Sequence, residues 1–433
     1  MASRDSLAAF RHPGVLRFCM GRLFSSMAAV IMSVAVGWEL YERTGSAFAL
    51  GLTGLVELLP VLVLALPAGV AADRLPRRTL AIAAHLMLSL CALALAALAY
   101  FAGPVALYYV VLFFVGVAIA FRNPSVSSML PQLVPPRDFA NANAWMSSIY
   151  EIASMAGPAL GGLLIAASGS AAFAFAATTV AHLFFVAVLL TLPRLPAVST
   201  GKAQGLDDML AGLRFVARTR VFLAAISLDL FAVMFGGAIA LLPMFAKDIL
   251  HVGPVGLGWL RAAPSLGAFV MAVIQLRLAP WKRPGRVLVV VVVGFGLSTI
   301  GFGLSESFAL SFAMLFLSGV FDNVSVVIRS TLEQTLTPDA MRGRVSAVHY
   351  VFIDLSNKLG SFESGSVAAL FGAVFSVVSG GTITLLVVAL VVLAFPELAR
   401  LAPLHTLKAL PGPGDDPPGG GEPRTGDSTS PAA

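Results

Sequence analysis

Ionisable side chains lie inside long apolar runs of the sequence, at positions remote from any polar stretch. The most central are Glu57, Glu151, Arg261, Asp354, Lys358 and Glu363. Others lie nearer the ends of their runs: Asp229, Asp322 and Arg22. Charges in an apolar medium are costly, so such groups are usually paired or functional. The chemistry open to them is ion pairing and, for a carboxyl shielded from water, uptake and release of a proton.

The stretch "AGVAADRLPRRTL", residues 68–80, places a tight group of charges between two apolar runs. It contains Asp73 together with Arg74, Arg77 and Arg78, and Gly69 precedes them. The carboxylate of Asp73 can accept hydrogen bonds from a helix N-terminus or an arginine. We therefore expect a latch between two parts of the chain, with its partner near Arg344. The alternative is that the arginines only set the topology.

A second motif, "SMAGPALGGLL" at 154–164, lies within the fifth apolar run. Pro158 removes one hydrogen bond of a helix. Gly157, Gly161 and Gly162 have no side chain and allow another helix to approach closely. The motif is either functional, as a resemblance described below implies, or a general small-residue packing face.

Motifs for catalysis or for a cofactor are missing from the sequence. There is no G-x-x-x-x-G-K-[ST] loop for ATP, no CxxC and no HExxH. The two cysteines, Cys19 and Cys91, lie far apart in apolar runs and are expected to be buried packing residues. The sequence therefore predicts neither an enzyme nor a resident metal or cofactor.

The elements that carry these residues are apolar throughout. Hydrophobic residues make up 58% of the chain and charged residues only 12%, whereas soluble domains carry about 25% charged residues. Apolar runs long enough to cross a bilayer as helices are expected near 16–40, 47–71, 79–101, 105–121, 139–166, 171–192, 221–242, 253–276, 286–304, 308–328, 345–370 and 376–395. The first run is too long for a signal peptide and is predicted to be retained.

The basic residues are distributed unevenly between alternate connections. Most of the 28 Lys and Arg residues fall in one set of connections, and the other set holds only Arg43 and Lys247. By the positive-inside rule both termini are expected in the cytoplasm. The net charge of +6 then reflects membrane topology, and no nucleic-acid partner is predicted.

The chain also contains an internal repeat at a shift of roughly 200 residues. Gly116, Pro135 and Gly162 fall on residues of the same type in the second half: Gly319, Pro338 and Gly365. Two like halves suggest an alternating-access transporter with its site between them. The predicted organisation is a six-helix bundle over 1–192, a cytoplasmic connection with an amphipathic segment over 193–220, a six-helix bundle over 221–397 and a disordered cytoplasmic tail over 398–433.

These motifs resemble those of the major facilitator superfamily. Gly69, Asp73, Arg74, Arg77 and Arg78 match its signature loop between helices two and three, except that Pro76 stands in place of a glycine. The segment "GPALGG" looks like the span-five motif of members that export solutes. The segments "RNPSVSSMLPQLVPPRDFANANAW" and "TPDAMRGRVSAV" resemble the enterobactin-exporter-like and macrolide-efflux-like branch. The fourth run has no arginine before Arg122, unlike that of many drug–proton antiporters.

The resemblance also implies which spans meet across the halves, namely two with eleven and five with eight. A rise of ~1.5 Å per residue places Glu57 level with Lys358, and Glu151 level with Arg261. We therefore hypothesise two ion pairs that form in one access state and break in another. They could instead be static, and Asp354 competes for Lys358 at a spacing of four. The aromatic side chains that could line a cavity for the cargo are Phe231, Phe235, Phe321 and Trp145.

The resulting prediction is an all-α membrane protein with twelve transmembrane helices in two pseudo-symmetric six-helix bundles. Its expected function is secondary active export of a small amphipathic compound, siderophore or drug-like, by proton-coupled antiport. The expected location is the inner membrane of a bacterial-type cell, with the protein working as a monomer. The alternatives are an importer of the same fold and a non-transporting membrane sensor.

Overall fold

Helix α1 (Val15–Thr44) illustrates how the chain begins and ends its long helices. Glycines flank it, Gly14 with φ 91° and Gly45 with φ 58°, a left-handed conformation that glycine adopts readily. Helix α2 (Ala47–Arg74) follows at once, and the Ser46 side chain accepts the first-turn hydrogen bond of Ala49. Two long helices are thus joined by a turn of two residues, which forces them to run antiparallel.

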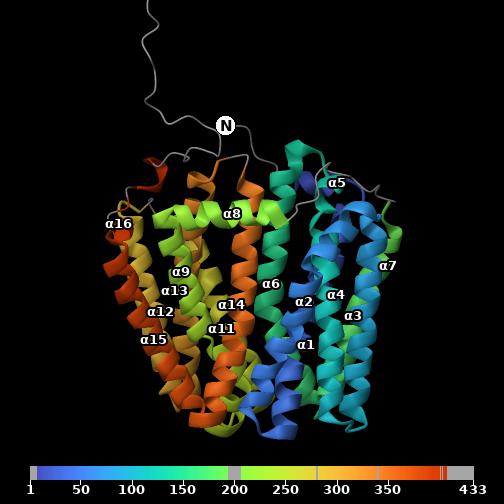
Figure 1. Cartoon of the computed structure of the whole chain (residues 1–433). Helices are drawn as coiled ribbons and strands as arrows, with labels where there is room; N and C mark the ends of the chain where they lie inside the picture. Colours follow the sequence, from blue (N-terminus) through green and yellow to red (C-terminus); the bar gives the residue numbers. More distant parts are fainter. Residues whose placement is uncertain are drawn as a thin grey trace, which may run out of the picture.

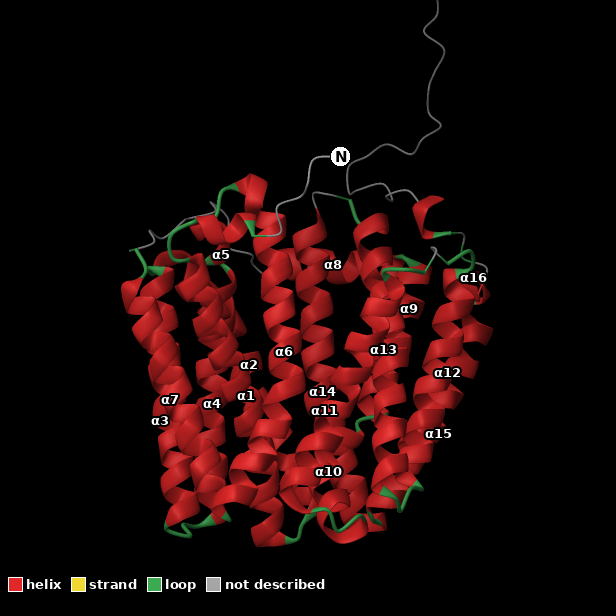
Figure 2. Ribbon diagram, turned by 180° about the vertical axis from the view of Figure 1, so that it is seen from behind, coloured by secondary structure: helices red, strands yellow, loops and turns green. Residues whose placement is uncertain are grey.

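The computed structural model describes residues 7–193, 206–278, 281–338, 341–399, 401 and 403–406, and no strand occurs among them (Figure 2). The remaining helices of the first half are η1 (Ala8–Arg11), α3 (Arg77–Tyr100), α4 (Val105–Ser127), α5 (Leu130–Leu133), α6 (Pro136–Ser168) and α7 (Ala171–Thr191). The helices of the second half are α8 (Leu206–Arg218), α9 (Arg220–Phe235), η2 (Ala238–Leu241), α10 (Leu242–Met244), η3 (Phe245–Ile249), α11 (Gly253–Gln275), α12 (Pro284–Gly303), α13 (Phe308–Leu336), α14 (Arg342–Phe371), α15 (Ala373–Ala394), α16 (Pro396–Ala399) and η5 (Leu404–Thr406).

Within the described residues, 11 helical segments are long and apolar enough to cross a membrane. Helix α14 is not among them, because it carries Asp354, Lys358 and Glu363 along with many small polar residues. It nevertheless runs the length of the bundle beside the other spans (Figure 1) and packs on α2, α9 and α15. The chain is therefore a multi-pass membrane protein, and the predicted all-helical fold class is confirmed.

The spans form two bundles that touch along two helix pairs. In the first bundle α1 packs on α6 and α7, and α3 packs on α4 and α7. In the second, α12 packs on α13 and α15, and α9 packs on α14 and α15. The bundles meet where α2 packs on α14 and α6 on α11, the pairs that the resemblance implied.

The two ends of the molecule differ in how the core is organised. We call the end where α1 begins and α15 ends the terminal end; it carries α8 and α16, and the opposite end is the distal end (Figures 1 and 2). One apolar core at the distal end includes residues of both bundles, among them Leu40, Tyr41, Leu242, Phe245 and Leu257. At the terminal end each bundle has cores of its own. The bundles are therefore fused distally and separate toward the terminal end.

The seventh span differs from the prediction of one continuous helix over 221–242. Helix α9 ends at Phe235, and the chain continues through Gly236 and Gly237 into the 3₁₀, α and π turns of η2, α10 and η3. Two successive glycines disfavour a continuous helix. The break lets the carbonyl of Phe235 press against Gly380 of α15, where a Cβ atom would lie 1.9 Å from that oxygen.

Helix α13 also differs from its prediction, because it continues to Leu336 rather than ending near residue 328. Arg329 falls just beyond the predicted run 308–328 but lies inside the second bundle, where it is only 3% exposed. Its ion pair with Asp229 of α9 compensates the buried charge.

The predicted central connection and tail are only partly described. Residues 194–205 and 407–433 lie outside the described residues, and the predicted disorder of the tail falls largely there. The amphipathic segment forms helix α8, which lies across the second bundle at the terminal end (Figure 1) and contacts α9 and α14. The proposed bundle boundaries at 192 and 221 remain predictions.

Candidate functional site: a cavity between the bundles

A cavity of about 480 Å³ lies between the two bundles, midway along the spans. The first bundle contributes residues of α1, α2 and α6 to its wall, and the second contributes residues of α9, η2, α11, α12, α13 and α14. Hydroxyl and amide groups are frequent in the lining: Ser33, Thr53, Tyr150, Ser154, Ser265, Ser298, Thr299, Ser318, Asn357 and Ser361. Such a mixed polar and apolar wall suits a solute that has both kinds of surface.

One cross-bundle ion pair borders the cavity. Lys358 of α14 donates a hydrogen bond to Glu57 of α2, and the two side chains are 28% and 19% exposed. The depth estimate had placed them at one level. Lys358 pairs with Glu57 across the bundles, and no ion pair with Asp354 occurs among the described residues.

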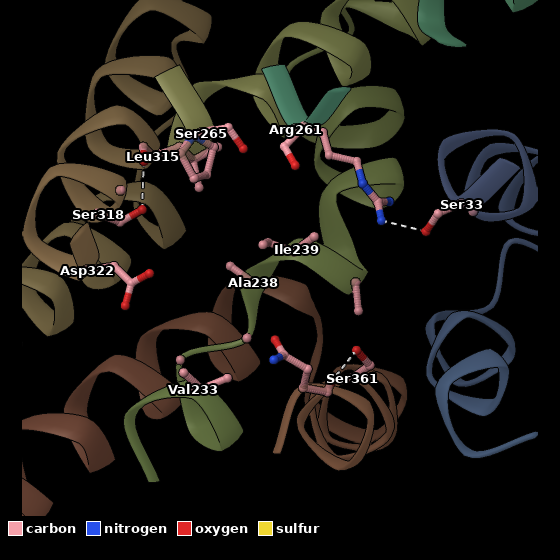
Figure 3. Close-up of a pocket in the computed structure, with 18 of the residues that line it drawn as sticks. Ser33, Val233, Ala238, Ile239, Arg261, Ser265, Leu315, Ser318, Asp322 and Ser361 are labelled. Carbon is pink, nitrogen blue, oxygen red and sulfur yellow. Dashed lines mark hydrogen bonds between the residues drawn. The ribbon is translucent and has the colours of Figure 1, made fainter. Parts of the chain in front are cut away.

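The second hypothesised pair is not formed in this conformation. Glu151 and Arg261 both line the cavity, from α6 and α11. Arg261 reaches α1 instead and donates a 2.6 Å hydrogen bond to Ser33 Oγ (Figure 3). Within the part of the chain that the structure describes, no ion pair joins Glu151 to Arg261. Both residues line one cavity, but a similar depth does not fix the direction in which a side chain points.

Two further acids lie in the second bundle. Asp322 of α13 lines the cavity beside Ser318 (Figure 3). Asp229 of α9 lies deeper and pairs with the buried Arg329. Arg329 was missed as a candidate, because its position after an apolar run is also that of an ordinary positive-inside residue.

The other predicted charges lie outside the lining of this cavity. Asp354 and Glu363 are on α14, and Ser364 Oγ donates to Glu363 at 3.3 Å. Arg22 of α1 lines a separate cavity of about 530 Å³ at the terminal end of the first bundle, together with Arg122 of α4.

The aromatic lining differs from the prediction. Tyr150 and Phe295 border the cavity, and the four predicted aromatics are not among its wall residues. Phe231 stacks on Phe235 with ring centroids 6.3 Å apart, and Trp145 packs on Phe10 at 4.8 Å. Phe321 packs with Asp229 and Asp322 around a small void between α9, α12 and α13. Sequence spacing alone did not separate packing aromatics from cavity aromatics.

The break in α9 brings main chain to the cavity wall. Gly236 and Gly237 line the cavity together with the first residues of η2, Ala238 and Ile239 (Figure 3). A broken helix at mid-membrane leaves peptide groups without their usual helical partners, and these can bind a solute or an ion. The sequence signal was the pair of adjacent glycines in "FGGAIALLP".

Glycines close the cavity on its distal side. Gly162 of α6 lies against Gly258 of α11, where an added Cβ would be 3.2 Å from the Gly258 Cα. Gly51 of α2 lies against Gly365 of α14, where it would be 3.0 Å away. The repeat had aligned Gly162 with Gly365, so equivalent glycines occupy equivalent crossings in the two halves. The helix backbones meet there and no side chain keeps them apart.

Two other glycines of the "SMAGPALGGLL" motif face within their own bundle. Gly157 and Gly161 lie against Val30 and Val34 of α1, with added Cβ atoms 3.0 and 3.3 Å from the valine Cβ atoms. The carbonyl of Pro158 approaches Gly258 across the bundles. One motif therefore provides tight packing both within the first bundle and between the bundles.

Polar contacts add to the distal closure. Tyr41 of α1 donates a hydrogen bond to Asp248 of η3. Lys247 Nζ lies 2.9 Å from a carboxylate oxygen of Glu42. These contacts join the bundles beyond the cavity, at the end where the apolar core is shared.

The predicted latch residues lie at the terminal end. Gly69 and Asp73 are in the last two turns of α2, and the side chain of Asp73 lies outside what the structure describes. Arg77 donates to the carbonyl of Ser128 at 2.9 Å, and Arg78 to that of Leu190 at 2.7 Å, both within the first bundle. Arg74 ends α2 and is exposed, while Arg344 lies in the first turn of α14.

A resident metal ion has no evident ligand set here. Among the described residues, no group of three or more His, Cys, Asp and Glu side chains converges at a spacing that would hold one. The arrangement instead offers charges, hydroxyls and the main chain of a broken helix around a space between two bundles.

The sequence matches a family model over residues 4–411, and that family is described as "Transmembrane secretion effector". The enterobactin exporter EntS of Escherichia coli O1:K1 / APEC is 26% identical over 390 residues, which cover 90% of this chain and 93% of the relative. The EntS of Shigella boydii serotype 18 matches to the same extent.

Solved transporters share the fold. A bacterial homologue of the human lysosomal transporter Spinster, in an inward-facing and occupied conformation, matches with a TM-score of 0.71 at 15% identity, over 88% of this chain and 96% of that one. A D-xylose–proton symporter matches with a TM-score of 0.67 at 15% identity, over 92% and 99%.

Proposed function

This chain belongs to the transmembrane secretion effector family of the major facilitator superfamily, and we propose that it exports a small amphipathic compound in exchange for protons. It is a membrane transporter and not an enzyme. The observation that carries the proposal is the cavity between the bundles, which is closed distally and bordered by charged groups of both halves. The similarity to enterobactin exporters and the "GPALGG" segment favour export over import.

The direction of loading follows from the charge distribution. The terminal end carries most of the basic residues, including Arg74, Arg77 and Arg78, so we assign it to the cytoplasm of a bacterial-type cell. The bundles have separate cores at that end and a shared core at the distal end. We infer that cargo enters this conformation from the cytoplasm, and we propose that both termini lie on that side.

Alternating access requires the distal contacts to open while the terminal ends approach each other. The glycine crossings hold the distal side closed by backbone contact, which separates without moving any side chain to a new rotamer. Glu57 and Lys358 lie just inside the crossing of α2 with α14, so cargo in the cavity can compete for either charge. The pair is then a contact that cargo and conformation both modulate.

The latch acts at the other end. In the outward-open state the α2–α3 connection would approach the start of α14. Asp73 would then accept hydrogen bonds from the first turn of α14 or from Arg344. Arg77 and Arg78 hold α3 to its own bundle through the Ser128 and Leu190 carbonyls, so that the connection moves with the first bundle as a rigid unit.

The chemical class of cargo follows from the lining. Hydroxyls and main-chain groups at the break of α9 can bind polar functions, and Val36, Leu50, Ile239 and Phe295 provide apolar surface. A siderophore or a drug-like molecule with both features fits this description. We propose that one polypeptide suffices, because the cavity is completed by the two halves of a single chain.

The test is accumulation of candidate compounds in cells with and without the gene, each measured with and without an uncoupler. Export predicts lower accumulation when the gene is present, and the uncoupler removes the difference. An importer would raise accumulation instead. A sensor would leave accumulation unchanged for every compound.

A further inference from the structure

A group of three charges connects the cavity with the broken helix α9. Arg329 of α13 is buried, and its guanidinium contacts Asp229 of α9. A second guanidinium nitrogen of Arg329 lies 3.9 Å from Asp322 Oδ1, two turns earlier on α13. The side chain of Asp322 is 47% exposed, against 12% for Asp229 and 4% for Arg329. The cluster thus has one face that solvent in the cavity can reach.

The charges of this cluster do not balance. Arg329 supplies one positive charge, and two carboxylates supply two negative charges when both are ionised. Asp229 makes the direct contact with Arg329, so the uncompensated charge resides at Asp322. An unbalanced charge at membrane depth is costly, and one added proton brings the cluster to neutrality.

Other charged groups around Asp322 are already engaged or more remote. On α11, Arg261 donates to Ser33 and points toward α1 (Figure 3). On α2 and α14, Glu57 and Lys358 pair with each other. Glu151 of α6 lines the cavity from the first bundle, and α12 contributes Phe295, Ser298 and Thr299. Arg329 and Asp229 are therefore the ionic neighbours of Asp322.

The cluster is tied to an element that can move. Asp229 lies less than two turns before the break of α9 at Phe235, and the break itself lines the cavity. With Asp322 ionised, Arg329 is shared between two carboxylates. With Asp322 protonated, Arg329 interacts with Asp229 alone, and this ion pair between α13 and α9 becomes stronger.

Building on the proposed antiport, we propose that Asp322 takes up the coupling proton from the cavity and that Arg329 transmits its charge state to α9 through Asp229. The proton comes from water on the distal side in the outward-open state. It adds to the carboxylate, forming an O–H bond, and leaves to cytoplasmic water when the cavity opens at the terminal end. A sodium ion fits this site poorly, because Arg329 at 3.9 Å repels a second fixed cation, whereas a proton removes the carboxylate charge.

The test needs no cargo. Spin labels at Phe101→Cys and Leu304→Cys, both exposed at the distal end, report the distance between the bundles in lipid nanodiscs. For the otherwise unmodified chain we expect the ratio of distal-closed to distal-open molecules to change with pH, by up to about tenfold per unit for one coupled proton. Asp322→Asn should hold that ratio constant with pH. Glu363→Gln, an intramembrane carboxyl outside the cavity lining, should keep the pH response.

A second variant separates proton uptake from transmission. Arg329→Gln with Asp229→Asn removes one charge of each sign, so no unpaired charge is left from that pair. Infrared difference spectra should still contain the protonated-carboxyl band of Asp322, while the distance distribution no longer follows pH. Thermal unfolding monitors folding of each variant.

Two results would overturn the proposal. One is a normal pH response in Asp322→Asn, whether or not Glu151→Gln loses it. The other is a ratio that follows sodium at constant pH but not pH at constant sodium. The outcome is independent of the accumulation assay. If the accumulation assay shows no export but the distance ratio still depends on pH through Asp322, the proposed function is rejected and the proton site is retained.

Discussion

The glycine crossings at the distal end give the sharpest prediction about how the transporter closes. At Gly51 of α2, an added Cβ would lie 3.0 Å from both the Gly365 Cα and the Ser361 carbonyl oxygen. At Gly365 of α14, it would lie 2.6 Å from the Gly51 Cα and 2.7 Å from its nitrogen. All of these neighbours are backbone atoms, so no change of rotamer relieves the contact.

We expect Gly51→Ala, and more strongly Gly365→Ala, to destabilise the distal-closed state. Inserting a methyl group into a well-packed contact costs about 1–3 kcal/mol. The distal-open state has no such contact, so the full cost acts on the equilibrium between the two states. The open fraction should therefore rise about 5- to 150-fold, with the larger increase for Gly365→Ala.

The assay is labelling of a cavity cysteine from outside the cell. Ser154→Cys places a thiol in the cavity wall on α6, away from the crossing of α2 with α14. A membrane-impermeant maleimide then reacts in proportion to distal opening. The matched control is Val63→Ile on the same helix as Gly51, because it adds one methyl group to a side chain that is 66% exposed.

The reasoning is refuted if Gly365→Ala leaves the labelling rate at its original value in a protein that still unfolds at its original temperature. It is also refuted if Val63→Ile raises labelling as much as Gly365→Ala. In either case the glycine crossing would not be what closes the distal side.

Two more predictions follow from the charged contacts. The single variant Lys358→Met should have a lower unfolding temperature than the double variant Glu57→Gln/Lys358→Met, because the single change leaves the partly buried carboxylate of Glu57 unpaired. If the effects of the two substitutions on stability simply add in a double-mutant cycle, the ion pair is contradicted. Arg43→Gln should cost about 1–3 kcal/mol of stability, because Arg43 donates to the carbonyls of Leu98, Ala99 and Gly103. All of these partners lie in the first bundle, so Arg43 is expected to stabilise that bundle and not the contact between the bundles. An increase in distal labelling without a lower unfolding temperature would contradict this role.

The number and place of the spans could be predicted from the sequence, because hydrocarbon thickness and helix rise fix how long an apolar run must be. The shared depth of Glu57 and Lys358 in the membrane was predictable for the same reason. The direction of Arg261 was not, because a long side chain at the right depth can reach several helices, and Ser33 of α1 proved to be its partner.

Arg329 shows a second reason why a site residue could not be predicted from the sequence. A basic residue at the end of an apolar run satisfies the positive-inside rule, and it looks the same in sequence whether α13 ends there or continues to Leu336. Its partner Asp229 is a hundred residues distant, and only the packing of α9 near α13 brings them together.

The internal repeat in the sequence identified two of the four glycines that meet at the distal closure. It aligned Gly162 with Gly365, but it could not identify Gly258 and Gly51 as their partners, because crossing points depend on how the bundles pack. The break of α9 was likewise visible only as two adjacent glycines, which helices sometimes tolerate. In the folded chain the break lies where the carbonyl of Phe235 meets Gly380 of α15, a contact between segments far apart in the sequence.

The central claim is that two bundles rock about a cavity between them, and paired distances at both ends test it most directly. Spin labels at Phe101→Cys and Leu304→Cys report the distal end, and labels at Leu75→Cys and Leu278→Cys, also exposed, report the terminal end. In the presence of Gly365→Ala, we predict that the distal distance lengthens and the terminal distance shortens in the same molecules. If the two distances lengthen together, or if neither changes while distal labelling of the cavity rises, the two-bundle account is contradicted.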